Sequence, residues 1–177
     1  MLGGEAFLGW LEDNVKGLRR REECVTADTV ERGVRFKSGV VRSDEKEDGV
    51  RECLNYGHTL GHAIEKVAGY GVVPHGIAVA EGMRFAARLS VEAAHGSKDF
   101  VGRQDRLLDG LGLPAMEMTL MPDRLLEAMH ADKKARGGSV RFVLPDAPGL
   151  WRCEPVADAM IGEHLAAWAQ SKQRGVG

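Results

Sequence analysis

The chain has 177 residues, 44% of them hydrophobic, and a formal net charge of −2, which suits one globular domain over residues 1–177. This charge argues against a general nucleic-acid binder, no apolar stretch approaches the length of a membrane span, and residues 1–5 are not expected to form a signal peptide. Three isolated cysteines without a CxxC pair are typical of reduced thiols in a cytoplasmic protein.

Apolar residues recur at helical spacing along most of the chain, which predicts a mainly α fold of about six helices. Asp28 is expected to cap the second helix, and Pro122 suits the first position of a later one. Small residues in the segment 75–94 let neighbouring helices approach closely, so this helix is expected at the buried centre. The expected helices cover residues 5–20, 28–44, 50–67, 75–94, 100–111 and 156–168, with a further one starting at Pro122.

One small β-hairpin is expected after the glycine pair Gly137-Gly138, which ends the helical pattern. Residues 140–144 and 150–153 are rich in apolar and aromatic side chains. The segment between them, residues 145–149, contains two prolines and a glycine, as turns do. The sequence therefore predicts an antiparallel hairpin between two helical segments.

The expected helix 50–67 carries the most informative pattern of the chain. Arg51, Asn55, His58 and His62 follow at spacings of 0, +4, +7 and +11, which places them within roughly 60° of one another on a regular helix. Apolar residues gather on the opposite side, as on a helix that packs against a core. A helix face with one guanidinium, one amide and two imidazoles indicates a metal ion or an anionic substrate.

The histidines allow two interpretations. His58 and His62 are separated by one helical turn, a spacing that lets two imidazoles share one metal ion, although Thr59 stands where a metalloprotease motif has its glutamate. His75, at the start of the next helix, is a third candidate ligand for a zinc site. Alternatively, the three are hydrogen-bonded histidines of the core.

Two lysine segments also allow two interpretations. Lys37 lies on the apolar stripe of its expected helix, where either its stem extends to solvent or its ammonium group points into a site. Lys133 and Lys134 belong either to an exposed charge run or to a loop that delivers an ammonium group to a phosphate or carboxylate. The remaining histidines are expected at the surface or at helix ends: His95, His130 and His164.

Residues 51–65, with the sequence RECLNYGHTLGHAIE, resemble the signature helix of 3-dehydroquinate synthases. Further segments resemble the same family in the same order along the chain. Related sugar-phosphate cyclases share parts of this series. The matching segments are Lys37 with Val40-Val41 and Asp44-Glu45, then Gly69-Tyr70-Gly71, His75-Gly76, Gly82-Met83, Asp132-Lys133-Lys134 and residues 141–145.

The resemblance implies the helical C-terminal domain of a lyase that uses NAD and a metal ion, Zn²⁺ or Co²⁺. That enzyme converts a phosphorylated keto-acid, 3-deoxy-D-arabino-heptulosonate 7-phosphate, into 3-dehydroquinate and phosphate in the shikimate pathway. The resemblance makes His58 and His75 metal ligands, and His62 a residue for proton transfer and substrate binding. The substrate phosphate and carboxylate would be held by cationic and amide side chains, namely Lys37, Arg51, Asn55, Lys133 and Lys134.

The chain also departs from the family pattern. The N-terminal NAD-binding domain of the family has no counterpart in these residues, and neither has a glutamate that serves as third metal ligand. Glu5 lies too late to replace that ligand, and Ile77 stands where many members have glutamate. We therefore expect half of an enzyme, inactive without its NAD-binding half and homodimeric when complete. The alternatives are another sugar-phosphate cyclase, of the inosose or valiolone type, and a catalytically dead helical module that serves assembly.

Overall fold

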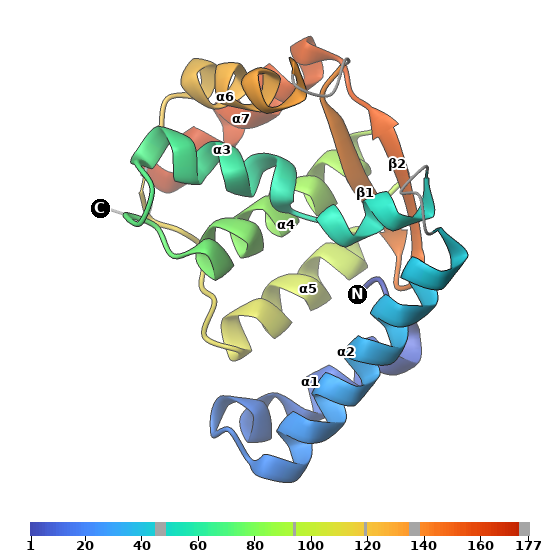
Figure 1. The fold of residues 1–177 in the computed structure, drawn as a ribbon. Coiled ribbons are helices and arrows are strands. Elements are labelled where there is room, and N and C mark those ends of the chain that lie inside the picture. Colours follow the sequence, from blue (N-terminus) through green and yellow to red (C-terminus); the bar gives the residue numbers. More distant parts are fainter. Residues whose placement is uncertain (45–48, 94, 119, 135–138, 174–177) are drawn as a thin grey trace.

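The structure, a computed structural model, describes residues 1–44, 49–93, 95–118, 120–134 and 139–173. In these ranges, the chain forms helices and one two-stranded antiparallel sheet, which lies at one side of the molecule (Figure 1), and this confirms the predicted mainly α fold with one hairpin. None of the helices in these ranges combines the length and apolar character of a membrane span. The elements are α1 (Glu5–Arg19), α2 (Glu23–Ser43), the 3-10 helix η1 (Val50–Asn55), α3 (His58–Ala68), α4 (His75–Glu92), α5 (Lys98–Gly110), α6 (Pro122–Lys134), β1 (Arg141–Ala147), β2 (Leu150–Pro155) and α7 (Asp158–Gln173).

Helix α4 forms the centre of the domain, as its small residues predict. It packs against α3, α5, β1 and α7, while α6 covers α3 and α7. Phe85 of α4 meets Phe142 of β1 with ring centroids 5.8 Å apart. Because burial of apolar surface drives folding, the core around α4 holds the elements of the site in place. Its largest fully buried side chains include Leu60, Ile64, Phe85, Leu89, Phe142 and Ile161.

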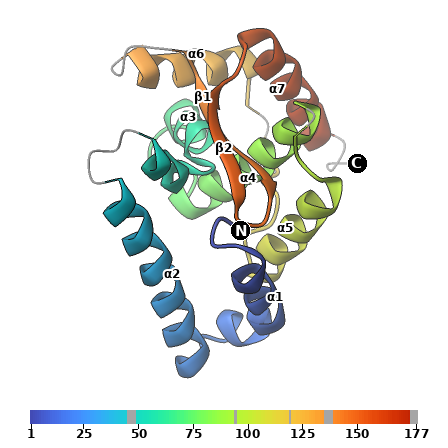
Figure 2. The same cartoon turned by 90° about the vertical axis from the view of Figure 1, so that its right-hand side faces the viewer.

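Helices α1 and α2 extend from the rest of the molecule (Figure 2), with α1 packed on α5 and α2 packed on α1 and η1. The pattern predicts that α2 begins after an Asp28 cap, but the helix begins at Glu23 and Asp28 lies inside it. The reason is local: the chain reverses directly after α1 through Arg21, which adopts a φ of 56°. The second helix therefore starts directly after a short turn at residues 20–22.

The hairpin pairs Val143 of β1 with Cys153 of β2 and turns at Pro148-Gly149. Both strands are longer than predicted, since β1 continues through Pro145 to Ala147. Residues 142–145 of β1 are buried, and β1 packs against α4. The hairpin thus closes one side of the core.

The single helix predicted over residues 50–67 is wrong, because the chain breaks at Tyr56-Gly57 into η1 and α3. Gly57 adopts a φ of 81° and lies against α4, where a Cβ placed on Gly82 would come within 1.9 Å of the Gly57 carbonyl oxygen. This close approach needs glycine on both sides. The predicted common face of four residues therefore does not exist, although His58 and His62 keep their spacing of one turn on α3.

Candidate metal and substrate site

Three imidazoles meet where α3 crosses the start of α4, and we call His58, His62 and His75 the histidine cluster. The ring centroid of His58 lies 5.3 Å from that of His62 and 5.5 Å from that of His75. His62 and His75 are 6.1 Å apart. The structure therefore brings together all three histidines that the sequence predicts as candidates.

The backbone explains this convergence. A Cβ on Gly61 would lie 3.2 Å from the backbone of Val79, so α3 and α4 touch nearly backbone to backbone at this point. Pro74 occupies the N-cap of α4 and leaves His75 as the first helical residue. Because α3 and α4 cross so closely, the first residue of α4 lies beside the histidines of α3.

His58 has one ring nitrogen engaged. Its Nδ1 lies 3.2 Å from the Tyr56 carbonyl oxygen, and since a carbonyl oxygen only accepts, Nδ1 must carry the hydrogen. Nε2 then keeps its lone pair. Burial, together with the neighbouring imidazoles of His62 and His75, lowers the pKa of His58, although the backbone of Tyr56 and Asn55 acts in the opposite direction. The neutral form that a metal ligand requires is thus favoured.

His75 is held in the same way by a different acceptor. Its Nδ1 lies 3.2 Å from Oε1 and 3.1 Å from Oε2 of Glu65, which again leaves Nε2 free. The sequence reasoning assigns no role to Glu65. Its position three residues after His62 on α3 is the one available signal, because residues three apart lie on the same helix face.

His62 differs from its two neighbours. It is exposed, and in the ranges that the structure describes it has no hydrogen-bond partner. It borders a cavity of about 450 Å³ between α3 and α6, with Thr59, Lys66 and Met129 in the walls. Its ring is therefore accessible to a molecule in that cavity.

The donor chemistry of the cluster fits a zinc-type ion. Histidines that bind metals usually donate their second ring N–H to a carboxylate or a backbone carbonyl, and His75 and His58 show these two arrangements. Zinc in proteins is usually four-coordinate, so two such histidines leave the ligand set incomplete. Accordingly, no three His, Cys, Asp or Glu side chains in the described ranges are arranged to hold an ion by themselves.

The polar and cationic side chains predicted for the substrate lie on elements around α3. Arg51 and Asn55 are half-buried on η1, and the Arg51 backbone N–H donates to Asp44 Oδ2 at 2.9 Å. Lys37 is exposed on α2, as in the interpretation in which its stem extends to solvent. Lys133 and Lys134 form the last turn of α6 rather than a loop, and their side chains lie outside the described residues.

The remaining histidines have structural surroundings. His95 is exposed, as predicted. His130 Nε2 lies 2.9 Å from Asp158 Oδ2 and joins α6 to α7. For His164 the predicted surface position is wrong, because its side chain is only 8% exposed, pairs with Glu92 at 2.9 Å and contacts the Phe85 ring. Burial of His164 depends on packing between α7 and α4, which the sequence does not display.

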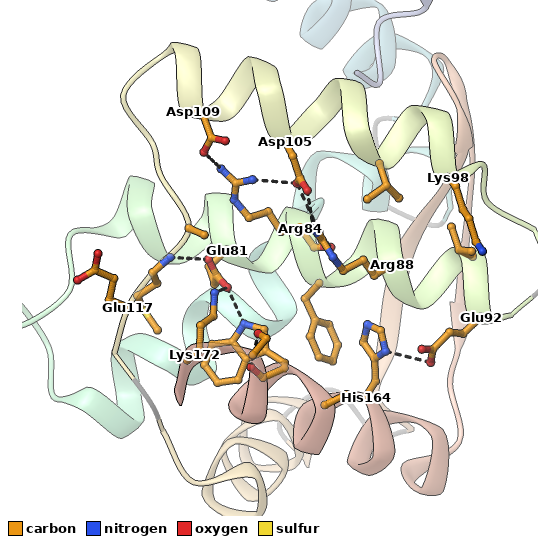
Figure 3. Close-up of a pocket in the computed structure, with 18 residues that line it drawn as sticks. Glu81, Arg84, Arg88, Glu92, Lys98, Asp105, Asp109, Glu117, His164 and Lys172 are labelled. Carbon is orange, nitrogen blue, oxygen red and sulfur yellow. Dashed lines mark hydrogen bonds and ion pairs between the residues drawn. The ribbon is translucent and has the colours of Figure 1, made fainter. Parts of the chain in front are cut away.

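A larger cavity of about 970 Å³ lies between α4, α5 and α7, and we call it the α4 groove (Figure 3). Glu81, 1% exposed, accepts hydrogen bonds from Trp168 Nε1 at 2.5 Å and from the Met116 backbone N–H at 2.9 Å, and pairs with Lys172. The pattern of small residues in α4 gives no sign of this buried carboxylate.

Arg84, also buried, completes the polar network of the α4 groove. Its terminal nitrogens donate to Asp105 and Asp109, each at 2.8 Å (Figure 3), and to the Leu113 carbonyl oxygen at 2.8 Å. These residues join α4, α5 and the segment after α5. The charges at the centre of this groove satisfy one another, so they hold helices together.

Several known proteins are similar to this chain in sequence and in fold. The family model described as 3-dehydroquinate synthase C-terminal matches residues 1–135. The 3-dehydroquinate synthase of Dehalococcoides mccartyi is 37% identical over 164 residues, which cover 93% of this chain and 43% of that enzyme. The enzyme of the same name from Pseudomonas putida is 45% identical over 141 residues, covering 78% and 38%. The chain thus spans less than half the length of these curated relatives.

Two solved structures have a similar fold. The 2-epi-5-epi-valiolone synthase of Streptomyces hygroscopicus, solved with NAD⁺ and Zn²⁺ bound, has a TM-score of 0.79 at 21% identity and covers 94% of this chain and 47% of that one. A 2-deoxy-scyllo-inosose synthase complexed with carbaglucose-6-phosphate, NAD⁺ and Co²⁺ has a TM-score of 0.65 at 27% identity, covering 73% and 38%. The family match and the identity to curated relatives together show that this chain belongs to the 3-dehydroquinate synthase C-terminal family.

Proposed function

We propose that this chain is the metal- and substrate-binding half of a 3-dehydroquinate synthase. The complete enzyme would convert 3-deoxy-D-arabino-heptulosonate 7-phosphate into 3-dehydroquinate and phosphate in the shikimate pathway. The observation that carries the proposal is the pair His58 and His75, each with Nδ1 bound to an oxygen acceptor and Nε2 left free. The names of the curated relatives support the choice of reaction.

In this proposal, His58 and His75 hold Zn²⁺ or Co²⁺ through Nε2, and a glutamate from the missing half completes the site. When bound, the metal supplies Lewis-acid polarisation of substrate hydroxyls. His62 has no partner in the described ranges and is exposed beside the other two imidazoles. It therefore suits transfer of a proton to and from a substrate oxygen, because imidazole both accepts and donates protons in the neutral pH range.

The substrate anions would be held by the elements that surround α3. Arg51 and Asn55 lie on η1, directly before His58, and Lys37 lies on α2, which packs against η1. Lys133 and Lys134 lie at the end of α6, which packs against α3. A guanidinium can bind phosphate or carboxylate through two parallel hydrogen bonds. Together these side chains would bind both charged ends of the substrate.

The missing half would bind NAD and supply the redox chemistry that makes phosphate elimination possible. The chain alone is therefore expected to be inactive. The test is phosphate release from the heptulosonate phosphate, with NAD⁺ and Zn²⁺, by the purified chain and by the chain joined to the N-terminal half of the Pseudomonas putida relative. We expect release only from the joined protein, and none when it carries His58→Ala. Sustained, metal-dependent release by the chain alone would overturn the half-enzyme proposal.

A second candidate function is that of another sugar-phosphate cyclase, of the inosose or valiolone type. The observation that favours it is the structural likeness to two such synthases. The higher identity to curated 3-dehydroquinate synthases argues for the first candidate. Assaying the joined protein with a panel of sugar phosphates, D-glucose 6-phosphate among them, separates the two, because turnover of another sugar phosphate without turnover of the heptulosonate phosphate would favour the second.

A further inference from the structure

We propose that Glu65 is a positioning residue that fixes the ring of His75 so that Nε2 faces the metal. Neither the family resemblance nor the sequence pattern assigns it this role, which rests on the proposed function of the cluster. Both carboxylate oxygens of Glu65 lie within hydrogen-bond distance of His75 Nδ1, at 3.2 and 3.1 Å. A carboxylate only accepts, so the contact selects the tautomer with hydrogen on Nδ1.

The fold explains why Glu65 is available for this contact. His58, His62 and Glu65 follow at spacings of 0, +4 and +7 within α3, so all three lie on one face of that helix. His75 comes from the next helix and meets this face because Gly61 lets α3 touch α4 at Val79. This face of α3 therefore places the Glu65 carboxylate beside His75 of α4.

His75 needs such a partner more than His58 does. His58 is half-buried, and the Tyr56 carbonyl, directly before α3, orients its ring. The His75 side chain is 56% exposed at the first position of α4, whereas Glu65 is only 16% exposed. An exposed ring can rotate and exchange tautomers unless a fixed group holds it. Glu65 is the fixed group, because most of its side chain is buried.

The arrangement also distinguishes the three imidazoles. The rings of His58 and His75 each have an oxygen acceptor on Nδ1, while His62 has no partner in the described part of the chain. Outer partners of this kind orient the ligand. Glu65 thus gives His75 an oriented ring like that of His58.

The experiment uses the 177-residue chain and three variants, Glu65→Ala, Glu65→Gln and a control, Glu127→Ala. Glutamine keeps an oxygen that accepts from Nδ1–H but carries no charge. Glu127 lies on α6 with its side chain 74% exposed, so the control removes an equivalent charge from the surface. The first readout is the tautomer of His75 without metal, from the ¹⁵N chemical shifts of the ring at pH 8. The second readout is the affinity for Zn²⁺ alone, measured by titration against a chelating indicator.

We expect hydrogen on Nδ1 of His75 in the wild-type chain, in Glu65→Gln and in Glu127→Ala, and a shift toward hydrogen on Nε2 in Glu65→Ala. Zn²⁺ affinity should fall by about 10- to 100-fold in Glu65→Ala and by less in Glu65→Gln. An unchanged tautomer in Glu65→Ala, or an affinity loss no larger than in the control, would overturn the role of Glu65. The Zn²⁺ titration is also run on the chain joined to the N-terminal half of the Pseudomonas putida relative, where a glutamate of that half would complete the proposed ligand set. If the joined protein did not bind Zn²⁺ but the tautomer shifted as expected, Glu65 would remain the residue that orients His75, and the metal site of the proposed function would be contradicted.

Discussion

The histidine cluster and the α4 groove both contain residues of α4, but they differ in how far their polar groups are buried and paired. In the groove, Glu81 and Arg84 are buried, and partners from α5, α7 and the segment after α5 engage them. In the cluster, His62 and His75 are exposed, and Nε2 of His58 and His75 has no partner in the described ranges. Satisfied buried charges hold helices in place, whereas accessible imidazoles with free lone pairs are available for chemistry.

The two regions depend on each other through α4. His75 is the first residue of this helix, and the groove residues Glu81 and Arg84 lie further along it. The groove fixes α4 against α5 and α7, and the glycine contacts fix α3 against α4. The position of His75 relative to α3 therefore follows from packing that lies outside the histidine cluster.

The largest effect on stability is expected at Glu81. Glu81→Ala leaves the ammonium group of Lys172, 9% exposed, and the Trp168 and Met116 N–H groups without their acceptor. Removal of one partner of a buried ion pair destabilises by about 3–5 kcal/mol. Urea unfolding should show this loss, while Glu163→Ala, at an exposed position of α7, should change the free energy of unfolding by less than about 0.5 kcal/mol. Equal effects would mean that the groove charges do not hold α7.

A smaller effect is expected at Gly82, where the two regions meet. A Cβ there would lie 1.9 Å from the Gly57 carbonyl oxygen, so Gly82→Ala must push α3 from α4, at about 1–3 kcal/mol for an overpacked site. Because the same contact sets the distance between His58 and His75, Zn²⁺ affinity should fall as well. The control is Gly162→Ala on α7, where a Cβ meets nothing within 4 Å. If Gly82→Ala lowered stability without weakening Zn²⁺ binding, the link between packing and site would be wrong.

The smallest effect is expected at a partly exposed charge network between α1 and α5. Arg103 on α5 binds Glu5 and Glu12 of α1, and these hydrogen bonds hold the pKa of both carboxyls below its ordinary value. A lowered folded-state pKa stabilises the fold above the ordinary pKa, and this contribution is lost as the pH falls. Between pH 6 and pH 3, the free energy of unfolding should therefore fall less in Arg103→Gln than in the wild type, and the difference should be a fraction of the Glu81 effect. Urea midpoints at each pH, with Arg106→Gln as control, measure the difference. If the change caused by Arg103→Gln were as large as the stability loss in Glu81→Ala, burial would not determine how much an ion pair contributes to stability.

Local patterns predict much of the fold and part of the site. The hairpin follows from composition and turn residues, and the spacing of His58, His62 and His75 predicts three histidines that do meet. The break at Gly57 cannot be predicted from periodicity, because its cause is contact with Gly82 on another helix. The roles of Glu65 and Glu81 cannot be predicted from the sequence pattern either, because each depends on a side chain of another helix that only the packed fold brings near.

The most direct test is the Zn²⁺ content of the chain joined to the N-terminal half of the Pseudomonas putida relative, measured after dialysis at one fixed free Zn²⁺ concentration and compared with that of the same protein carrying His58→Ala, His75→Ala or His62→Ala. If His58 and His75 are the ligands, both of these variants should lose most of the bound metal. His62→Ala should keep nearly all of it. Loss of metal in His62→Ala as complete as in His58→Ala would contradict this assignment and show instead that His58 and His62, one helical turn apart, share the ion.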